Sequence, residues 1–205
     1  MGRITAVIFD VGDVLFPWTP RRLYERLIED DRALDAFMRD VVSMDWHFQH
    51  DLGRPFAETS AELIALHPQH AALIRLWGES FVDSIGAPIE GMAAVVADLH
   101  ANAVALYGLT NFSAEFWRPF HAREADFFTP FAGILVSGEE GLAKPDPAIY
   151  RLALHRFGLR AEESLFIDDR QVNVDAAQRE GIRALQFCTA AALRTELREL
   201  GLLAR

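Results

Sequence analysis

Cysteine is almost missing from this chain of 205 residues, which holds only Cys188. A single thiol excludes an internal disulfide and any zinc site built from cysteines, and it is typical of a reducing compartment. Hydrophobic runs long enough to cross a bilayer are also missing, and so is the charged-then-apolar opening of a secretory signal. We therefore expect a cytoplasmic protein.

Positive charge is scarce as well. Lys and Arg number 20 against 30 Asp and Glu, which gives a formal net charge of −10. Because the chain has no basic block, we expect neither nucleic acid nor a membrane surface as a partner. The basic residues are 19 Arg and one Lys, Lys144. This exception suggests a place that needs a compact ammonium instead of a planar guanidinium.

Short and strongly apolar runs predict the buried strands of a parallel sheet. These runs are Ile4–Phe9, Ala103–Leu109, Gly133–Val136, Ser164–Ile167 and, more weakly, Ile182–Phe187. Helical patterns separate most of them, with an N-cap at Asp146 and a closing glycine at Gly158. This alternation predicts the α/β class, with a Rossmann-like parallel sheet that carries helices on both faces.

The segment from residue 17 to residue 87 departs from that alternation. It has no convincing strand, and its patterns predict helices that open at Thr19 or cover Arg32–Val42, Pro55–His67 and Gln69–Ser84. A helical block of roughly seventy residues is too long for a plain crossover. We predict an α/β core of residues 1–16 and 88–205 and an inserted helical cap of residues 17–87. In the cap, Trp18, Trp46, Phe48 and Trp77 are expected in the core rather than as a platform for a sugar.

Polar side chains gather where the predicted strands end, at the edge where open α/β sheets bind ligands. They are Asp10, Thr110, Asn111, Lys144, Asp168 and Asp169. Three carboxylates at close quarters repel one another unless a cation lies among them, and oxygen ligands suit Mg²⁺. A carboxylate nucleophile, a hydroxyl and an ammonium around such a metal fit phosphoryl transfer.

Four motifs carry a resemblance to a known family: Phe9–Leu15, Thr110-Asn111, Lys144-Pro145, and Asp168-Asp169 with Asn173. In this order and at these spacings, they resemble the haloacid dehalogenase superfamily, which consists mostly of phosphatases. The resemblance covers residues 1–16 and 89–205, and the helical insertion stands where that family places its cap. It implies Mg²⁺-dependent hydrolysis of a small phosphorylated metabolite, a phosphomonoester, through an aspartyl-phosphate.

The resemblance also implies roles for individual residues. Asp10 would be the nucleophile, Thr110 would bind a phosphoryl oxygen, and Lys144 would neutralise its charge. Mg²⁺ would be held by Asp10, the carbonyl of Gly12 and the pair Asp168 and Asp169, and family members with Gly-Asp at this pair favour Asp169 as the direct ligand.

Further positions would contact the substrate. Val11, Gly12 and Asn111 belong to the motifs around the phosphoryl group. His50 and Asp51 lie in a segment similar to the loop of the family's cap that overhangs the site, so they would reach the substrate from that side.

One position departs from the family's pattern. Family phosphatases usually carry an Asp two residues after the nucleophile as general acid and base, but this chain has Gly12, followed by Asp13. This variant is similar to a sugar-phosphatase branch that acts on compounds such as α-D-glucose 1-phosphate. Loss of a general acid costs about 10²–10⁴-fold in rate. It is tolerable if the leaving group is good, or if water or Asp13 replaces the acid.

Two alternatives stay open. The dehalogenase branch also lacks the second Asp, and it displaces halide from a 2-haloacid without metal, using a cap arginine for the carboxylate. Its fourth motif resembles Ser-Asn, so the pair Asp168 and Asp169 favours a metal enzyme instead. The second alternative is a non-catalytic binding protein that keeps the fold, which Gly12 makes conceivable.

Overall fold

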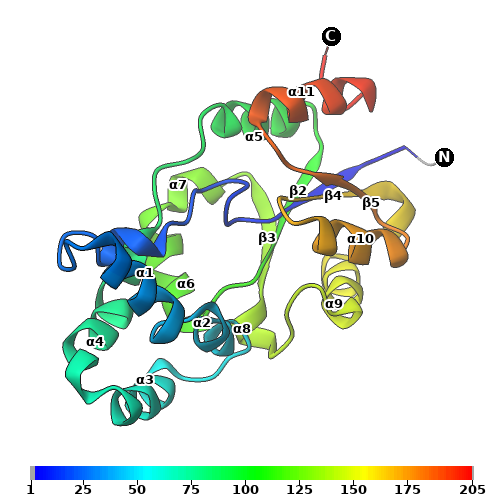
Figure 1. The fold of residues 1–205 in the computed structure, drawn as a ribbon. Helices are drawn as coiled ribbons and strands as arrows, with labels where there is room; N and C mark the ends of the chain where they lie inside the picture. The colour runs from blue at the N-terminus through cyan, green and yellow to red at the C-terminus, as the bar shows by residue number, and fades with distance from the viewer. Residues whose placement is uncertain (1–2, 205) are drawn as a thin grey trace.

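Five parallel strands form the centre of the computed structural model, which describes residues 3–204 (Figure 1). Their order is β3-β2-β1-β4-β5. The strands are β1 (Ala6–Phe9), β2 (Ala105–Thr110), β3 (Phe131–Val136), β4 (Ser164–Asp168) and β5 (Arg183–Gln186). The predicted Rossmann-like sheet is therefore confirmed, and each of the five apolar runs contributes a strand.

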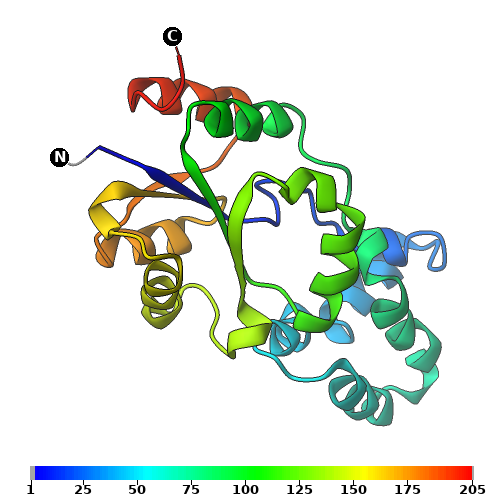
Figure 2. The same ribbon diagram turned by 180° about the vertical axis from the view of Figure 1, so that it is seen from behind.

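Side chains that alternate along the strands divide the interior into two hydrophobic cores. In β1, Val7 and Phe9 belong to one core and Ile8 belongs to the other. Helices α5 (Met92–Ala101) and α11 (Ala190–Glu199) cover the first face, and α9 (Pro147–Phe157) and α10 (Gln171–Arg179) cover the second. Figures 1 and 2 show the two pairs on opposite sides of the sheet, as predicted.

The helix ends follow ordinary capping chemistry. The side chain of Asp146 accepts a hydrogen bond from the backbone N–H of Ala148 at the start of α9, and Gly158 ends that helix with a φ of 66°. Ser113 caps α6 (Ala114–Arg123). The short elements α7 (Ala125–Phe128), α8 (Ser137–Glu140) and η4 (Ala161–Glu163) complete the core.

The long segment between β1 and α5 is built of helices and holds no strand of the sheet, and we call its helical part the cap (Figure 1). Its elements are η1 (Pro20–Leu23), α1 (Asp31–Asp40), α2 (Met44–Asp51), α3 (Phe56–Leu66), η2 (Pro68–His70), α4 (Ala71–Ser80) and η3 (Phe81–Ser84). Helix α2 is not predicted by periodicity. The reason is that its buried face consists of Trp46, His47, His50 and Asp51, so no apolar stripe marks it.

The chain crosses between core and cap twice, and the two crossings pair with each other. Trp18 forms an antiparallel bridge with Ile85, and the N–H of Gly86 donates to the carbonyl of Pro17 at 2.9 Å. The indole N–H of Trp18 donates to the hydroxyl of Ser84 at 3.1 Å. These bonds hold the base of the cap beside the end of β1, where the candidate site lies.

Away from the crossings, cap and core meet at Gly138, where backbones approach without a side chain between them. A Cβ at Gly138 would lie 2.6 Å from the nitrogen of Ala114, 2.8 Å from the carbonyl of Phe112 and 3.1 Å from the carbonyl of His50. Helix α8, the loop after β2 and helix α2 of the cap therefore share one contact.

We expect Gly138→Ala to lower the free energy of unfolding by about 2–3 kcal/mol, because the contacted atoms belong to backbone and cannot rotate away. Urea unfolding at pH 7 measures the change. Gly12→Ala is the matched control, since a Cβ at that position meets nothing within 4 Å, and its stability should stay within about 0.5 kcal/mol of wild type. Equal stabilities for the two variants would contradict this interpretation of the contact.

Candidate active site

A buried lysine joins two strands at the carboxyl edge of the sheet. The ammonium of Lys144 lies 2.8 Å from Oδ1 of Asp10 and 2.7 Å from Oδ2 of Asp168. Asp10 follows β1 directly and Asp168 ends β4, and these two strands are neighbours. The Lys144 side chain is only 1% exposed, so the ion pairs are shielded from water and each partner depends on the others.

Hydrogen bonds fix the backbone of Lys144 and the carboxylate of Asp168 that its ammonium contacts. The amide of Asn111 donates to the carbonyl of Lys144 at 2.9 Å and accepts from the N–H of Lys144 at 2.8 Å. Asn173 donates to both carboxylate oxygens of Asp168, at 2.9 and 3.1 Å. The hydroxyl of Tyr150 donates to the carbonyl of Asn173 at 3.0 Å. The geometry therefore rests on residues of four predicted motifs.

The carboxylates of Asp10, Asp168 and Asp169 can present oxygens within 4.8 Å of one another. When all three carboxylates are ionised, their charges and the one ammonium of Lys144 leave two negative charges in this cluster. A divalent cation supplies that charge, and a donor set made only of oxygens is the one Mg²⁺ prefers. The residues present therefore fit the metal predicted from the sequence.

The pKa values reflect the crowding of these acids. Burial raises the pKa of Asp10 to about 8, with Asp168 adding to the rise and Lys144 opposing it. Burial alone would raise the pKa of Asp168 too, but Lys144, the N–H of Arg170 and Asn173 lower it overall. Burial and the charges of Asp168 and Asp13 raise the pKa of Asp169. The cluster thus lacks positive charge.

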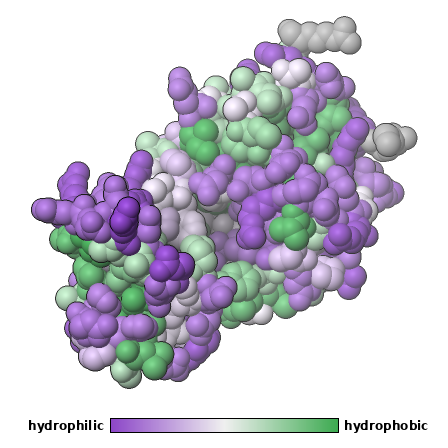
Figure 3. Space-filling view, in the orientation of Figure 1, coloured by the Kyte–Doolittle hydropathy of each residue, from purple (hydrophilic) through white to green (hydrophobic). Residues whose placement is uncertain are grey.

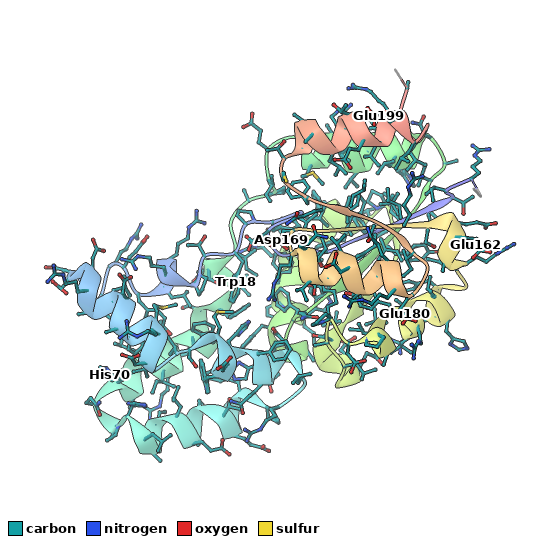
Figure 4. All side chains as sticks on the ribbon, turned by 45° about the vertical axis from the view of Figure 1, so that its right-hand side comes forward. Trp18, His70, Glu162, Asp169, Glu180 and Glu199 are labelled. Atoms are coloured by element: carbon teal, nitrogen blue, oxygen red, sulfur yellow. The ribbon has the colours of Figure 1, made fainter. Side chains whose placement is uncertain are left out.

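A cavity of about 530 Å³ opens in front of this cluster, between core and cap. The space-filling view shows the recess between the two parts (Figure 3). In Figure 4, Trp18 faces it from the side of the cap and Asp169 from the side of the core. The predicted residues that line it are Asp10, Val11, Gly12, Asp51, Asn111, Lys144 and Asp169. Asn173 of the fourth motif lines it as well.

Three predicted residues do not line the cavity. Thr110 is the last residue of β2 and is 1% exposed, and Asp168 is fully buried behind Lys144. The third residue is His50, and the prediction that it contacts substrate is not supported. Its Nε2 lies 2.6 Å from the hydroxyl of Thr59, and its ring is buried inside the cap. Since α2 continues through His50 as a helix instead of a loop, the side chain points inward and only Asp51 reaches the cavity.

Sequence reasoning missed part of the cavity wall. Trp18 and Phe48 are expected in the core of the cap, yet both line the cavity, together with Met44. Met44 is 53% exposed and Phe48 is 37% exposed. Recognising helix α2 would have placed Met44, Phe48 and Asp51 on the same side, because they are spaced four and three residues apart.

Asp13, the residue after Gly12, contacts the first crossing into the cap. Its backbone has a φ of 55°, which Asp tolerates better than most residues. Its Oδ1 accepts a hydrogen bond from the N–H of Trp18 at 2.9 Å. The side chain thus ties the loop after β1 to the first crossing into the cap.

Comparison with known proteins shows the family to which the chain belongs. The family model of haloacid dehalogenase-like hydrolases matches residues 4–181, so the chain belongs to this family and is an enzyme of the hydrolase class. A sesquiterpene phosphatase of Aspergillus oryzae is 30% identical over 203 residues, covering 95% of both chains.

Two solved structures share the fold. A family enzyme of Bacteroides thetaiotaomicron, in complex with magnesium and inorganic phosphate, has a TM-score of 0.71 at 17% identity and covers 91% of this chain and 95% of its own. An L-2-haloacid dehalogenase of Xanthobacter autotrophicus has a TM-score of 0.63 at 18% identity, with coverages of 98% and 85%. Within residues 3–204, no helix is long and apolar enough to span a membrane.

Two buried histidines beside the cavity make the cap sensitive to acid. Burial lowers the pKa of His47 to about 3 and that of His50 to about 4, with the charges of His50 and Arg54, respectively, adding to the shifts. Above the ordinary histidine pKa of 6.5, both rings are neutral in the folded and the unfolded chain. Below pH 6.5, the two histidines bind protons in the unfolded chain but stay neutral in the folded chain, so the free energy of unfolding decreases as pH falls.

We expect His47→Asn to lessen the loss of unfolding free energy between pH 7 and pH 4 by about 2–3 kcal/mol. Urea unfolding at several pH values in this range measures it. The variant His155→Asn removes an exposed histidine of α9, and its free energy of unfolding should depend on pH as that of wild type does. The prediction fails if the His47 and His155 variants lose stability in parallel.

Proposed function

We propose that this hydrolase is a Mg²⁺-dependent phosphatase, which hydrolyses a small phosphomonoester in the cytoplasm through an aspartyl-phosphate on Asp10. The observation that carries the proposal is Lys144, held between Asp10 and Asp168 with Asp169 beside them at the floor of one cavity. A carboxylate nucleophile, a fixed ammonium and a divalent cation, which the surplus negative charge would bind, are the groups that phosphoryl transfer to an acid requires.

The residues take the following parts. A carboxylate oxygen of Asp10 attacks phosphorus, and Lys144 holds a phosphoryl oxygen close to that attack. The N–H group of Gly12 and the second N–H of the Asn111 side chain are the donors proposed for the remaining oxygens, because the N–H of Val11 donates to Oδ1 of Asp10 at 2.7 Å and Thr110 does not line the cavity. Asp10, the carbonyl of Gly12 and Asp169, with Asp168 behind them, would hold Mg²⁺, which would supply positive charge to the phosphoryl group when bound. Water then releases phosphate from Asp10.

The relatives and the cavity wall support a phosphatase over the dehalogenase alternative. The relative with 30% identity is named as a phosphatase, and a structural neighbour was solved with magnesium and inorganic phosphate. A metal-free dehalogenase needs a cap arginine. Among the residues described, the arginine that lines the cavity is Arg170, which comes from the core. The set of charged site residues is complete apart from the acid missing at Gly12, and this favours an enzyme over a protein that only binds.

Asp10→Asn should lower the turnover of p-nitrophenyl phosphate by at least about 10³-fold, because an amide oxygen is a poor nucleophile and carries no charge for the metal. Steady-state kinetics with Mg²⁺, with EDTA, and with Mg²⁺ restored measure this. Asp126→Asn removes an exposed carboxylate of α7 and is the control, which should retain wild-type rates.

Three results would contradict the proposal. Activity of Asp10→Asn within about tenfold of wild type would exclude the aspartyl-phosphate. Chloride release from 2-chloropropionate in EDTA, without phosphatase activity in Mg²⁺, would establish the dehalogenase. Binding of phosphate without turnover of any ester would establish a binding protein.

A further inference from the structure

The cavity is polar at its floor and mostly apolar on its other walls. The large apolar side chains that line those walls are Trp18, Met44, Phe48, Phe81 and Ile85 from the cap and its crossings, and Phe16, Phe112 and Phe120 from the core. Six of these eight are aromatic. With the phosphoryl group at Asp10 and Lys144, the rest of a substrate lies against these walls.

The polar groups that the cap offers are few. Of the described residues that line the cavity, Asp45, His47 and Asp51 are the polar ones contributed by cap helices. The Nε2 of His47 already lies 3.6 Å from Oδ2 of Asp51. A sugar brings several hydroxyl groups, and each one that is buried without a partner costs about 1–3 kcal/mol. The cavity therefore does not suit a substrate covered with hydroxyls.

The rim of the cavity also exposes apolar surface. Met44 and Phe48 are among the large hydrophobic side chains with high exposure, and they lie four residues apart on α2. A hydrocarbon that enters the cavity would cover both of them. A volume of about 530 Å³ is ordinary for a site that encloses a small organic molecule.

We propose that the substrate is the phosphomonoester of an apolar alcohol, whose hydrocarbon part packs among these aromatic residues. The inference rests on the proposed phosphatase activity and names its substrate class. It differs from the sugar phosphates suggested by the motifs, because those motifs lie mostly on the core, whereas the cap builds much of the wall around the leaving group.

The test compares n-butyl, n-hexyl and n-octyl phosphate with α-D-glucose 1-phosphate, and acetyl phosphate serves as the reference for phosphoryl transfer. We expect kcat/KM to rise about threefold for each added methylene, in line with the free energy of burying it. A flat series, or a preference for the glucose ester, with acetyl phosphate still hydrolysed, overturns this inference alone. No turnover of any of these phosphates overturns the proposed function as well.

A variant pair checks that the walls carry the preference. Phe48→Glu places a charge at the rim and should lower the ratio of octyl to acetyl phosphate turnover by at least about tenfold. Leu66→Glu changes a cap residue that is 75% exposed and does not line the cavity, so the ratio should stay that of wild type. Equal ratios in both variants overturn the inference.

A second observation concerns the acid that Gly12 lacks. Asp51 ends α2, lines the same cavity and is 5% exposed. Its Oδ1 has no hydrogen-bond partner among the residues described, although it is buried. An unpaired carboxyl oxygen inside a protein is costly unless a ligand pairs with it.

We propose that Asp51 is the proton donor to the leaving alcohol. Asp10 attacks phosphorus, the bond from phosphorus to the alcohol oxygen breaks, and its electron pair takes the proton of Asp51, so a neutral alcohol leaves. In the second step, water attacks phosphorus and gives a proton back to the Asp51 carboxylate, while the bond from phosphorus to Asp10 breaks. Each turnover restores both acids.

The surroundings of Asp51 keep it protonated near neutrality. Burial raises the pKa of Asp51 to about 7, with Lys144 and the N–H of Ser113 opposing the rise. The Nε2 of His47 on the same helix lies 3.6 Å from Oδ2 of Asp51, and the lowered pKa of His47 leaves it neutral. A donor to an alcohol has to be protonated when the bond breaks, so the activity is lost as pH rises through about 7.

The experiment compares benzyl phosphate, a poor leaving group, with p-nitrophenyl phosphate, a good one of similar shape. Asp51→Asn should lower kcat on benzyl phosphate by at least about a hundredfold, change kcat on p-nitrophenyl phosphate far less, and remove the loss of benzyl phosphate turnover above pH 7. Equal loss on both substrates, or no loss on either, overturns the proposal. Asp13→Asn is the matched comparison, and a selective loss there would assign the proton to Asp13 instead.

Discussion

The site depends on one buried ammonium between two carboxylates. Lys144 reaches Asp10 and Asp168 at 2.8 and 2.7 Å, and together they join the loop before α9 to the ends of β1 and β4. Losing one partner would leave a buried charge without compensation, which costs about 3–5 kcal/mol. The proposed catalysis and the fold therefore depend on the same contact, and the surplus negative charge left around it is the reason for which we propose a divalent cation there. Arginine, which this chain uses at every other basic position, is too wide and planar for a gap between two carboxylates.

The core of this fold is readable from the sequence because it repeats a local rule. Each strand is a short apolar run, each ends in polar residues, and parallel strands bring those ends to one edge. Asp10, Lys144 and Asp169 could be assigned to one site for this reason. Helix α2 could not be found in this way, since its buried face consists of polar and aromatic residues, two of which, Trp46 and His50, find their hydrogen-bond partner Thr59 only in the folded cap. The inward position of His50 beside Thr59 follows from that packing and has no signal in the sequence.

The cap contributes to the site in two physically different ways. Its crossings, paired at Trp18 and Ile85, fix its base beside the loop after β1, and Asp13 accepts the N–H of Trp18 at that point. At the other side, Gly138 lets α8 and α2 approach at backbone distance. Helix α2 is therefore held by contacts that leave no room for a larger residue. It carries Met44, Phe48 and Asp51 to the cavity as one rigid unit, and this is why one helix can set both the apolar character of the wall and the place of a carboxyl group.

Packing does not explain the glycine at position 12. A Cβ there would meet nothing within 4 Å, and the residue does not need a positive φ. A carboxylate two residues after the nucleophile would thus fit, but it would add a fourth negative charge to a cluster that already holds three acids against one lysine. With Asp51 of α2 as the proposed proton donor, that charge stays away from the proposed metal site, and burial raises its pKa. On this assignment the core transfers the phosphoryl group and the cap protonates the alcohol, so a poor leaving group depends on the acid that α2 carries to the cavity.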